Sequence, residues 1–209
     1  MDIIKQLQWR YATKKFDAEK QVSEDKLHII KTAFNLTATS YGLQPIKLVI
    51  LKDKKLQSEL VDCSMNQEQV RQASHVLVFC IETNIDKDYI ETYFNRVKTI
   101  RNTPDKILNS FKEFLIEDFT NKHQDEIYDW ATKQAYLAMG NLLTVCALEG
   151  IDACPMEGFS PEKYDALLNL KDKGLSSVLV MPIGYRSEDD FFANLKKVRK
   201  TIAESTLEL

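Results

Sequence analysis

The longest helical pattern in the sequence, residues 124–149, limits the possible folds more than any other segment. Apolar and small residues recur throughout it: Ile127, Trp130, Ala131, Ala135, Leu137, Ala138, Met139, Gly140, Leu142, Leu143, Val145 and Leu148. Because these side chains face several directions around a helix, we expect it to be buried on nearly all sides. Gly150 follows directly and is typical of a helix C-cap. In a chain of 209 residues, such a helix indicates a subunit interface as well as a core.

Three apolar runs of strand length accompany this helix, at residues 46–51, 75–83 and 176–185. Their apolar residues are largely continuous, which is typical of strands in a sheet covered on both faces. Further helical patterns lie between and before them, so helices and strands alternate along the chain. The sequence therefore predicts the α+β (mixed α/β) class, with one central sheet.

The remaining helical patterns have recognisable boundaries. A short amphipathic pattern at residues 3–7 leads into Trp9 and Arg10, and Ser23 is a good N-cap for the helix that follows it. Residues 86–123 are polar, dotted with aromatic residues and helical in pattern, and Pro104 is expected to break them into two. We expect this segment to diverge most from related proteins.

The domain organisation is simple. The sequence contains no internal repeat, no low-complexity stretch and no linker rich in proline or glycine. We therefore expect one domain over residues 1–209. Its last part, from about residue 186, becomes polar and charged and is expected to form a C-terminal arm.

Composition excludes several classes of function. There are 28 basic and 31 acidic residues and a net charge of −3, without the basic excess that nucleic-acid binding requires. The longest uncharged apolar runs, residues 76–81 and 178–183, are too short to span a membrane, and residues 1–5 do not resemble a secretory signal. We expect a cytoplasmic protein.

Cysteine and histidine usage indicates neither disulfides nor a metal site. The four cysteines form no CxxC pair and are expected to be reduced thiols: Cys63, Cys80, Cys146 and Cys154. The three histidines lie far apart in the sequence, without the spacing of metal ligands. The glycine-rich signatures of dinucleotide-binding folds, P-loops and nucleophile elbows are also missing from the sequence.

Four short segments carry the functional signal, and none is specific alone. They are Arg10-Tyr11-Ala12-Thr13-Lys14, Thr39-Ser40-Tyr41-Gly42-Leu43-Gln44-Pro45, Pro155-Met156-Glu157-Gly158 and Lys197-Val198-Arg199. Their order and spacing resemble those of the FMN-dependent nitroreductase family over nearly the whole chain. The resemblance is nearest to oxygen-insensitive nitroreductases and related dihydropteridine reductases. It implies a nitroreductase-like central sheet flanked by helices, and an intertwined homodimer.

The resemblance assigns the phosphate of FMN to cations from opposite ends of the chain. Arg10, Lys197 and Arg199 match the phosphate ligands of the family, and a guanidinium fork suits phosphate oxygens. Tyr11 and Ala12 stand where many relatives carry a His-Ser pair, so one hydroxyl ligand is missing. The alternative for all three cations is an ordinary solvated basic surface. Lys197 and Arg199 alternate, so an extended segment would point both the same way.

Three further positions match residues that surround the pyrimidine ring of the flavin. Lys14 carries over as the cation beside the ring; it is one helical turn from Arg10 if the first helix continues. Asn66 matches an asparagine on the pyrimidine edge, and its alternative role is the N-cap of the next helix. Gln69 stands where close relatives often carry a second lysine, which implies weaker stabilisation of negative charge on the reduced flavin.

The two remaining segments match loops that contact the flavin. Thr39, Ser40, Gln44 and Pro45 match a loop that packs over the flavin from the other subunit, and the alternative is a turn that ends a helix. The segment Pro155-Met156-Glu157-Gly158 matches the loop beside flavin N5, with a backbone N–H of Glu157 or Gly158 as the donor. Its alternative is a surface turn. Gly158 permits a backbone conformation that other residues resist.

The resemblance implies an oxidoreductase in which tightly bound FMN carries the chemistry. NADH or NADPH would donate hydride, and a nitroaromatic, quinone, free flavin or pteridine would accept electrons in a ping-pong cycle. No side chain needs to act as a covalent catalyst. The alternative is a flavin-binding regulatory or storage protein with little turnover.

Overall fold

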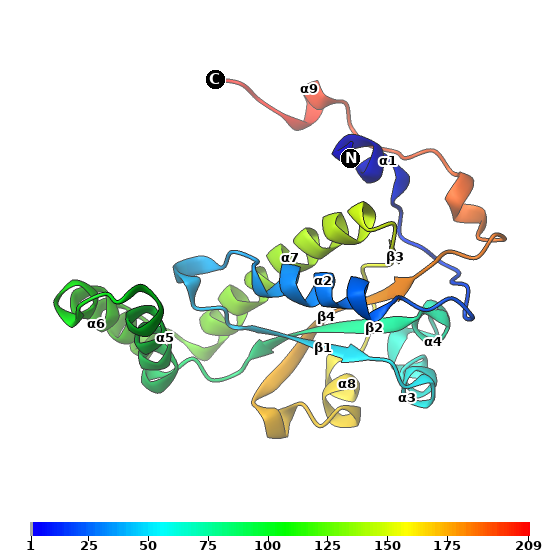
Figure 1. The fold of residues 1–209 in the computed structure, drawn as a ribbon. Coiled ribbons are helices and arrows are strands. Elements are labelled where there is room, and N and C mark those ends of the chain that lie inside the picture. The colour runs from blue at the N-terminus through cyan, green and yellow to red at the C-terminus, as the bar shows by residue number, and fades with distance from the viewer. Residues whose placement is uncertain (1) are drawn as a thin grey trace.

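The structure of the protein is a computed structural model that describes residues 2–209. Its centre is an antiparallel sheet with the strand order β1-β2-β4-β3 (Figure 1). The strands are β1 Ile46–Leu51, β2 His75–Glu82, β3 Asp152–Ala153 and β4 Leu175–Gly184. The three longer strands confirm the sequence prediction to within a residue. The edge strand β3 was not predicted, because two residues are too few to show an apolar pattern.

Both faces of the sheet are covered, as the continuous apolar runs predicted. Along β2, Leu77, Phe79 and Ile81 pack into one core with residues of α2 (Glu24–Asn35) and α7 (Gln124–Leu148). Val76, Val78 and Cys80 point the other way, as successive strand residues must. They join a second core that lies beneath three short helices: α3 Lys54–Glu59, α4 Gln69–Gln72 and α8 Pro161–Leu167.

Helix α7 confirms the longest helical pattern, and Gly150 follows it in the left-handed region with φ +65°. Its burial is one-sided, with Ala131, Ala135, Ala138 and Leu142 facing the core. Tyr136 and Leu137 remain 46% and 56% exposed. The expectation of burial on nearly all sides is therefore wrong for a single chain, which leaves an apolar face of α7 uncovered.

Helices α5 (Lys87–Arg101) and α6 (Asp105–Asn121) form a pair that extends from one end of the sheet (Figure 1). Pro104 is the N-cap of α6, so the predicted break is confirmed. The two helices share a small apolar core with the loop after α2 and the start of α7, which includes Leu43 and Ile127.

The two chain ends run together on the opposite side of the molecule (Figure 1). Helix α1 (Ile3–Trp9) ends before Arg10, whose backbone is extended. After β4 the chain continues through a 3-10 turn at Phe191–Asn194 to the short helix α9 (Ile202–Ser205), largely exposed. No helix within residues 2–209 is both long and apolar enough to cross a membrane.

Candidate functional site

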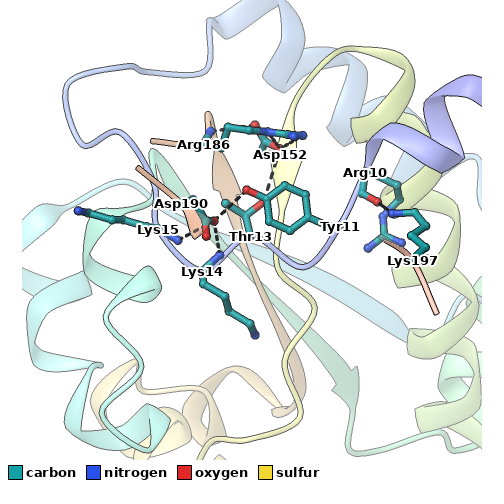
Figure 2. A network of polar contacts seen from close by, with 9 residues as sticks. All are labelled: Arg10, Tyr11, Thr13, Lys14, Lys15, Asp152, Arg186, Asp190 and Lys197. Atoms are coloured by element: carbon teal, nitrogen blue, oxygen red, sulfur yellow. Dashed lines mark hydrogen bonds and ion pairs between the residues drawn. The ribbon is translucent and has the colours of Figure 1, made fainter. Parts of the chain in front are cut away.

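Asp190 organises the segment that follows α1. Its Oδ2 accepts hydrogen bonds from the Tyr11 hydroxyl at 2.8 Å, the Lys14 backbone N–H at 2.9 Å and the Lys15 backbone N–H at 3.1 Å (Figure 2). Its Oδ1 accepts one from the Phe192 backbone N–H at 3.1 Å. Burial alone would raise the pKa of this carboxyl, but the hydrogen bonds outweigh it and leave the pKa below its usual value. The segment is thus pinned by a charged acceptor from the C-terminal arm.

A buried ion pair lies next to this anchor. The Arg186 backbone N–H donates to Asp152 Oδ2 at 2.8 Å, and its Nε donates to Oδ1 at 2.8 Å. The guanidinium lies 4.2 Å from the ring centroid of Trp9 and 4.6 Å from that of Tyr11. Asp152 is only 4% exposed. Strand β3, the chain after β4 and the segment after α1 are therefore joined at one point (Figure 2).

Of the three cations matched to the flavin phosphate, Lys197 reaches Arg10 directly, and Arg199 lies near enough for its charge to lower the pKa of both. Lys197 Nζ donates to the backbone carbonyl of Arg10. Burial, and next the charge of Arg199, lower the pKa of the Arg10 guanidinium. Burial, and then the charges of Arg10 and Arg199, lower the pKa of Lys197. Because α1 ends at Trp9, Arg10 and Lys14 do not share a helical face, and the helical-turn interpretation is wrong.

Within the part of the chain that the structure describes, these cations have no anionic partner. None of the ion pairs formed within residues 2–209 includes Arg10, Lys197 or Arg199. Like charges held together without a carboxylate are unfavourable, and an anion such as a phosphate would relieve them.

A second group of matched residues meets at Cys154. Lys14 Nζ and Gln69 Nε2 each lie 3.8 Å from its sulfur. Gln69 Nε2 also donates to Gln67 Oε1 at 2.8 Å, and Gln67 Nε2 donates to the Gly158 carbonyl at 2.9 Å. These contacts link Lys14 in the segment after α1 with the start of α4 and the loop after β3. Burial raises the pKa of the Cys154 thiol, and all four cysteines are free.

The loop after β3 is anchored to the sheet. Met156 exchanges two backbone hydrogen bonds with Val180 of β4, and its side chain is buried. Glu157 accepts a hydrogen bond from the Tyr136 hydroxyl of α7 at 2.7 Å. A Cβ at Gly158 would lie 3.2 Å from both Gln67 Nε2 and Met65 Sδ. Pro155, Met156, Glu157 and Gly158 thus form a fixed loop between the sheet and α7, rather than a free surface turn.

Asn66 lies in the turn before α4, with an exposed side chain and a left-handed backbone at φ +57°. Its backbone N–H donates to the Val61 carbonyl at 3.1 Å. Helix α4 begins at Gln69 with Glu68 as its N-cap. The alternative role of Asn66 as a helix cap is therefore wrong, and its amide remains available to a ligand.

The loop of Thr39, Ser40 and Gln44 lies elsewhere in this chain. The Ser40 backbone N–H donates to Gln134 Oε1 of α7 at 2.8 Å, and the Gln44 N–H donates to Thr39 Oγ1 at 3.0 Å. The loop packs on α5, at the opposite end of the sheet from the segment after α1 (Figure 1). It forms the expected turn, but within one chain it does not join the other site residues.

Sequence reasoning missed four residues of this site. Asp190 stands in an acidic run that looks like a solvated tail, and Asp152 and Arg186 carried no pattern at all. Cys154 directly precedes the Pro155–Gly158 segment, and this adjacency was the one available signal. The contacts of the other three depend on chain segments brought together only by folding.

Comparison with known proteins places the fold and the sequence in one family. The model of the nitroreductase family matches residues 7–185. The chain belongs to the nitroreductase family. Among relatives, the oxygen-insensitive NAD(P)H nitroreductase of Salmonella typhimurium is 33% identical to it over 99% of each chain. That of Enterobacter cloacae is 32% identical over 95% of each.

A solved structure of the family shows the same fold. A nitroreductase of Exiguobacterium sibiricum, in complex with FMN, has a TM-score of 0.84 to this nitroreductase-family chain at 16% identity. The alignment covers all of this chain and 98% of the other. The predicted nitroreductase-like arrangement of sheet and helices is thus confirmed.

Proposed function

We propose that this nitroreductase-family chain is an FMN-dependent oxidoreductase that takes hydride from NADH or NADPH and reduces nitroaromatics, quinones, free flavins or pteridines. One observation carries the proposal. Lys197 contacts Arg10 with Arg199 close by, and none of the three pairs with a carboxylate among residues 2–209. Lys14 and Gln69 meet nearby at Cys154. The first group suits a phosphate, and the second suits the polar edge of a ring.

The residues present fit FMN. The Arg10 cluster supplies charge-assisted donors for a phosphate, and its mutual repulsion would be relieved by a bound dianion. The amide of Asn66 offers a donor and an acceptor, which an imide-like pyrimidine edge requires. Backbone N–H groups at Glu157 and Gly158 lie on a loop held by β4 and α7, so they form a rigid donor for the ring.

When bound, FMN supplies the chemistry by accepting a hydride from NAD(P)H and passing electrons to an acceptor. The side chains orient it and set its charge environment. Lys14 would hold a positive charge beside the bound ring and so favour its reduced form. Gln69 offers a neutral amide beside it, a weaker stabiliser than an ammonium.

We further propose a homodimer in which residues 1–209 form one domain, with a C-terminal arm from about residue 186. The exposed apolar face of α7 supports this, because a single chain leaves Leu137 and Tyr136 partly in solvent. The arm adds exposed apolar residues that a partner subunit would cover, including Val198 at 86% and Ile202 at 81% exposure. A second subunit would also bring its Thr39–Gln44 loop over the flavin. Sedimentation at micromolar concentration tests this, and a monomer would contradict both the dimer and the shared site.

Anaerobic titration of the purified protein tests the activity. We expect a yellow protein whose flavin absorbance bleaches with NADH or NADPH and returns with a nitroaromatic or a quinone. A protein that stays yellow with either donor would instead be a flavin-binding regulatory or storage protein. An acceptor screen by stopped-flow reoxidation then identifies the preferred class of acceptor.

A further inference from the structure

Lys14 is held at both of its ends. Its backbone N–H donates to Asp190 Oδ2 at 2.9 Å (Figure 2). Its ammonium lies 3.8 Å from Cys154 Sγ. The next residue, Lys15, donates its backbone N–H to the same Asp190 oxygen, but its side chain pairs with Asp189 at the surface. The two backbone N–H groups share this anchor, and the two side chains leave it in different directions (Figure 2). Of the two lysines, Lys14 is the one whose ammonium lies beside Cys154.

The anchor itself is rigid. Asp190 is 3% exposed, and its other oxygen accepts the Phe192 N–H that caps the following 3-10 turn. The Ser187 N–H donates to the Lys15 carbonyl at 2.9 Å, and the Asp190 N–H donates to the Ser187 carbonyl at 3.1 Å. The start of the C-terminal arm and the segment after α1 therefore form one hydrogen-bonded unit. A movement of Asp190 has to move Lys14.

We infer that Asp190 is a positioning residue for the flavin site: its carboxylate fixes the Lys14 backbone and thereby places the Lys14 ammonium beside Cys154 and Gln69. The inference rests on the proposed role of Lys14 as the cation beside the flavin ring. Asp190 does not itself touch the cofactor in this scheme. It acts through the lysine.

The sign of the change in flavin midpoint potential separates positioning from a direct effect of charge. A carboxylate near the flavin disfavours reduction through space, so neutralising it would raise the potential. If Lys14 is displaced, its positive charge no longer stabilises the negative charge of the reduced ring, so the midpoint potential falls. The two mechanisms predict opposite results for the same substitution.

The test is spectroelectrochemical titration of FMN-loaded Asp190→Asn. In one orientation, the asparagine amide places an N–H donor against the Tyr11, Lys14 and Lys15 donors and the anchor is lost. In the other, it keeps an uncharged oxygen there but opposes the Phe192 N–H, so the anchor is weakened in either orientation. We expect the oxidised-to-reduced equilibrium to shift about tenfold toward oxidised flavin, roughly 30 mV for this two-electron couple. Asp189→Asn is the matched control, because it removes an exposed carboxylate one position earlier. It should shift the equilibrium less than threefold.

A potential that is unchanged or raised in Asp190→Asn would overturn the inference. Where that variant does not hold FMN, Asp190→Glu carries the test, because it keeps the charge and displaces the acceptor by one methylene. It should lower the potential in the same direction, and an unchanged value there would equally overturn the inference. Amide hydrogen exchange at Lys14 and Lys15 gives a readout independent of the flavin, and we expect at least tenfold faster exchange in Asp190→Asn.

Lys14→Met separates this inference from the proposed function. If Lys14→Met leaves the potential unchanged, the proposed role of Lys14 fails and the inference fails with it. If Lys14→Met lowers the potential and Asp190→Asn does not, only the inference fails. In the double variant Lys14→Met/Asp190→Asn, we expect no further lowering, since Asp190 acts through the residue already removed.

Discussion

The two ends of the central sheet are built from different interactions. At one end, Asp152 and Asp190 hold segments from three parts of the chain by directional, charged hydrogen bonds. At the other, the loop after α2 packs with α5, α6 and α7 through ring contacts with centroids 5.0 to 6.4 Å apart. The rings are Tyr41, Phe94, Phe111, Phe119 and Trp130. We call these the polar end and the aromatic end.

The difference matters for what each end can do. Charged hydrogen bonds have narrow geometry, so the polar end holds its atoms in one arrangement, which a bound cofactor requires. Ring contacts tolerate several geometries at similar energy, so the aromatic end can adapt to molecules of different shape. Its rings are partly open, with Tyr41 42% and Phe111 44% exposed. We expect the polar end to bind FMN and the aromatic end to select acceptors across the proposed dimer.

The largest effect should come from breaking the ion pair of the polar end. Arg186→Ala leaves Asp152 buried without its charged partner and removes a guanidinium packed between Trp9 and Tyr11. We expect the free energy of unfolding to fall by about 3 kcal/mol. The measurement is urea denaturation.

Arg71→Ala is the matched control, because Arg71 pairs with Glu68 at 2.6 Å on the exposed surface. Such a pair contributes less than about 1 kcal/mol. An equal loss of unfolding free energy in the two variants would show that the Arg186–Asp152 pair stabilises the protein no more than an exposed surface ion pair does.

The next effect concerns FMN affinity. Arg199→Ala removes one charge-assisted contact to the phosphate, worth about 1.5 to 3 kcal/mol, and should weaken FMN binding by roughly one to two orders of magnitude. Arg10→Ala should act similarly. Fluorescence titration of the apoprotein with FMN measures both, with the neighbouring Lys200→Ala as the control. Unchanged affinity in both arginine variants would rule out the cation cluster as the phosphate site.

A smaller effect is expected at Gln69, which meets Lys14 at Cys154. Gln69→Lys adds a second cation beside the ring, so it should raise the flavin midpoint potential by about 30 mV, equivalent to roughly 1.4 kcal/mol, and speed reduction by NAD(P)H. Lys14→Met should shift the potential the other way by at least as much. A potential that stays constant or falls in Gln69→Lys would mean that residue 69 does not face the pyrimidine ring.

The smallest effect should come from the aromatic end. Phe111→Ala removes ring contacts to Tyr41 and Phe94, worth about 1 kcal/mol, so KM for a nitroaromatic acceptor should rise a few-fold while FMN affinity stays constant. Steady-state kinetics with saturating NADH or NADPH measures this. Ile107→Ala is the control, because Ile107 is an exposed apolar residue of the same helix. A loss of FMN affinity in Phe111→Ala would remove the proposed division between the two ends.

The candidate site could be predicted only where residue type and spacing carry information. Arg10, Lys14 and Gly158 stood in recognisable segments. In the structure Arg10 contacts Lys197, Lys14 contacts Cys154, and Gly158 contacts Gln67. Asn66 was recognisable as an amide before α4, but its left-handed turn was not. The role of Asp190 could not be predicted, because an aspartate looks the same in the sequence whether its carboxylate is buried or exposed to solvent. Its burial comes from the return of the arm against the segment after α1.

The sequence by itself determined the mixed class, the three long strands, the helix of residues 124–148 and its glycine end. These depend on local periodicity and capping, which neighbouring residues control. Only the tertiary structure decided that Arg10 meets Lys197, that Lys14 faces Cys154, and that the Thr39–Gln44 loop lies apart from both. Such contacts join residues far apart in the chain, and no periodic pattern encodes which distant segments will meet. The one-sided burial of α7 has the same cause. The apolar composition of this helix predicts that its side chains will be buried, but it does not show which other part of the protein will cover them.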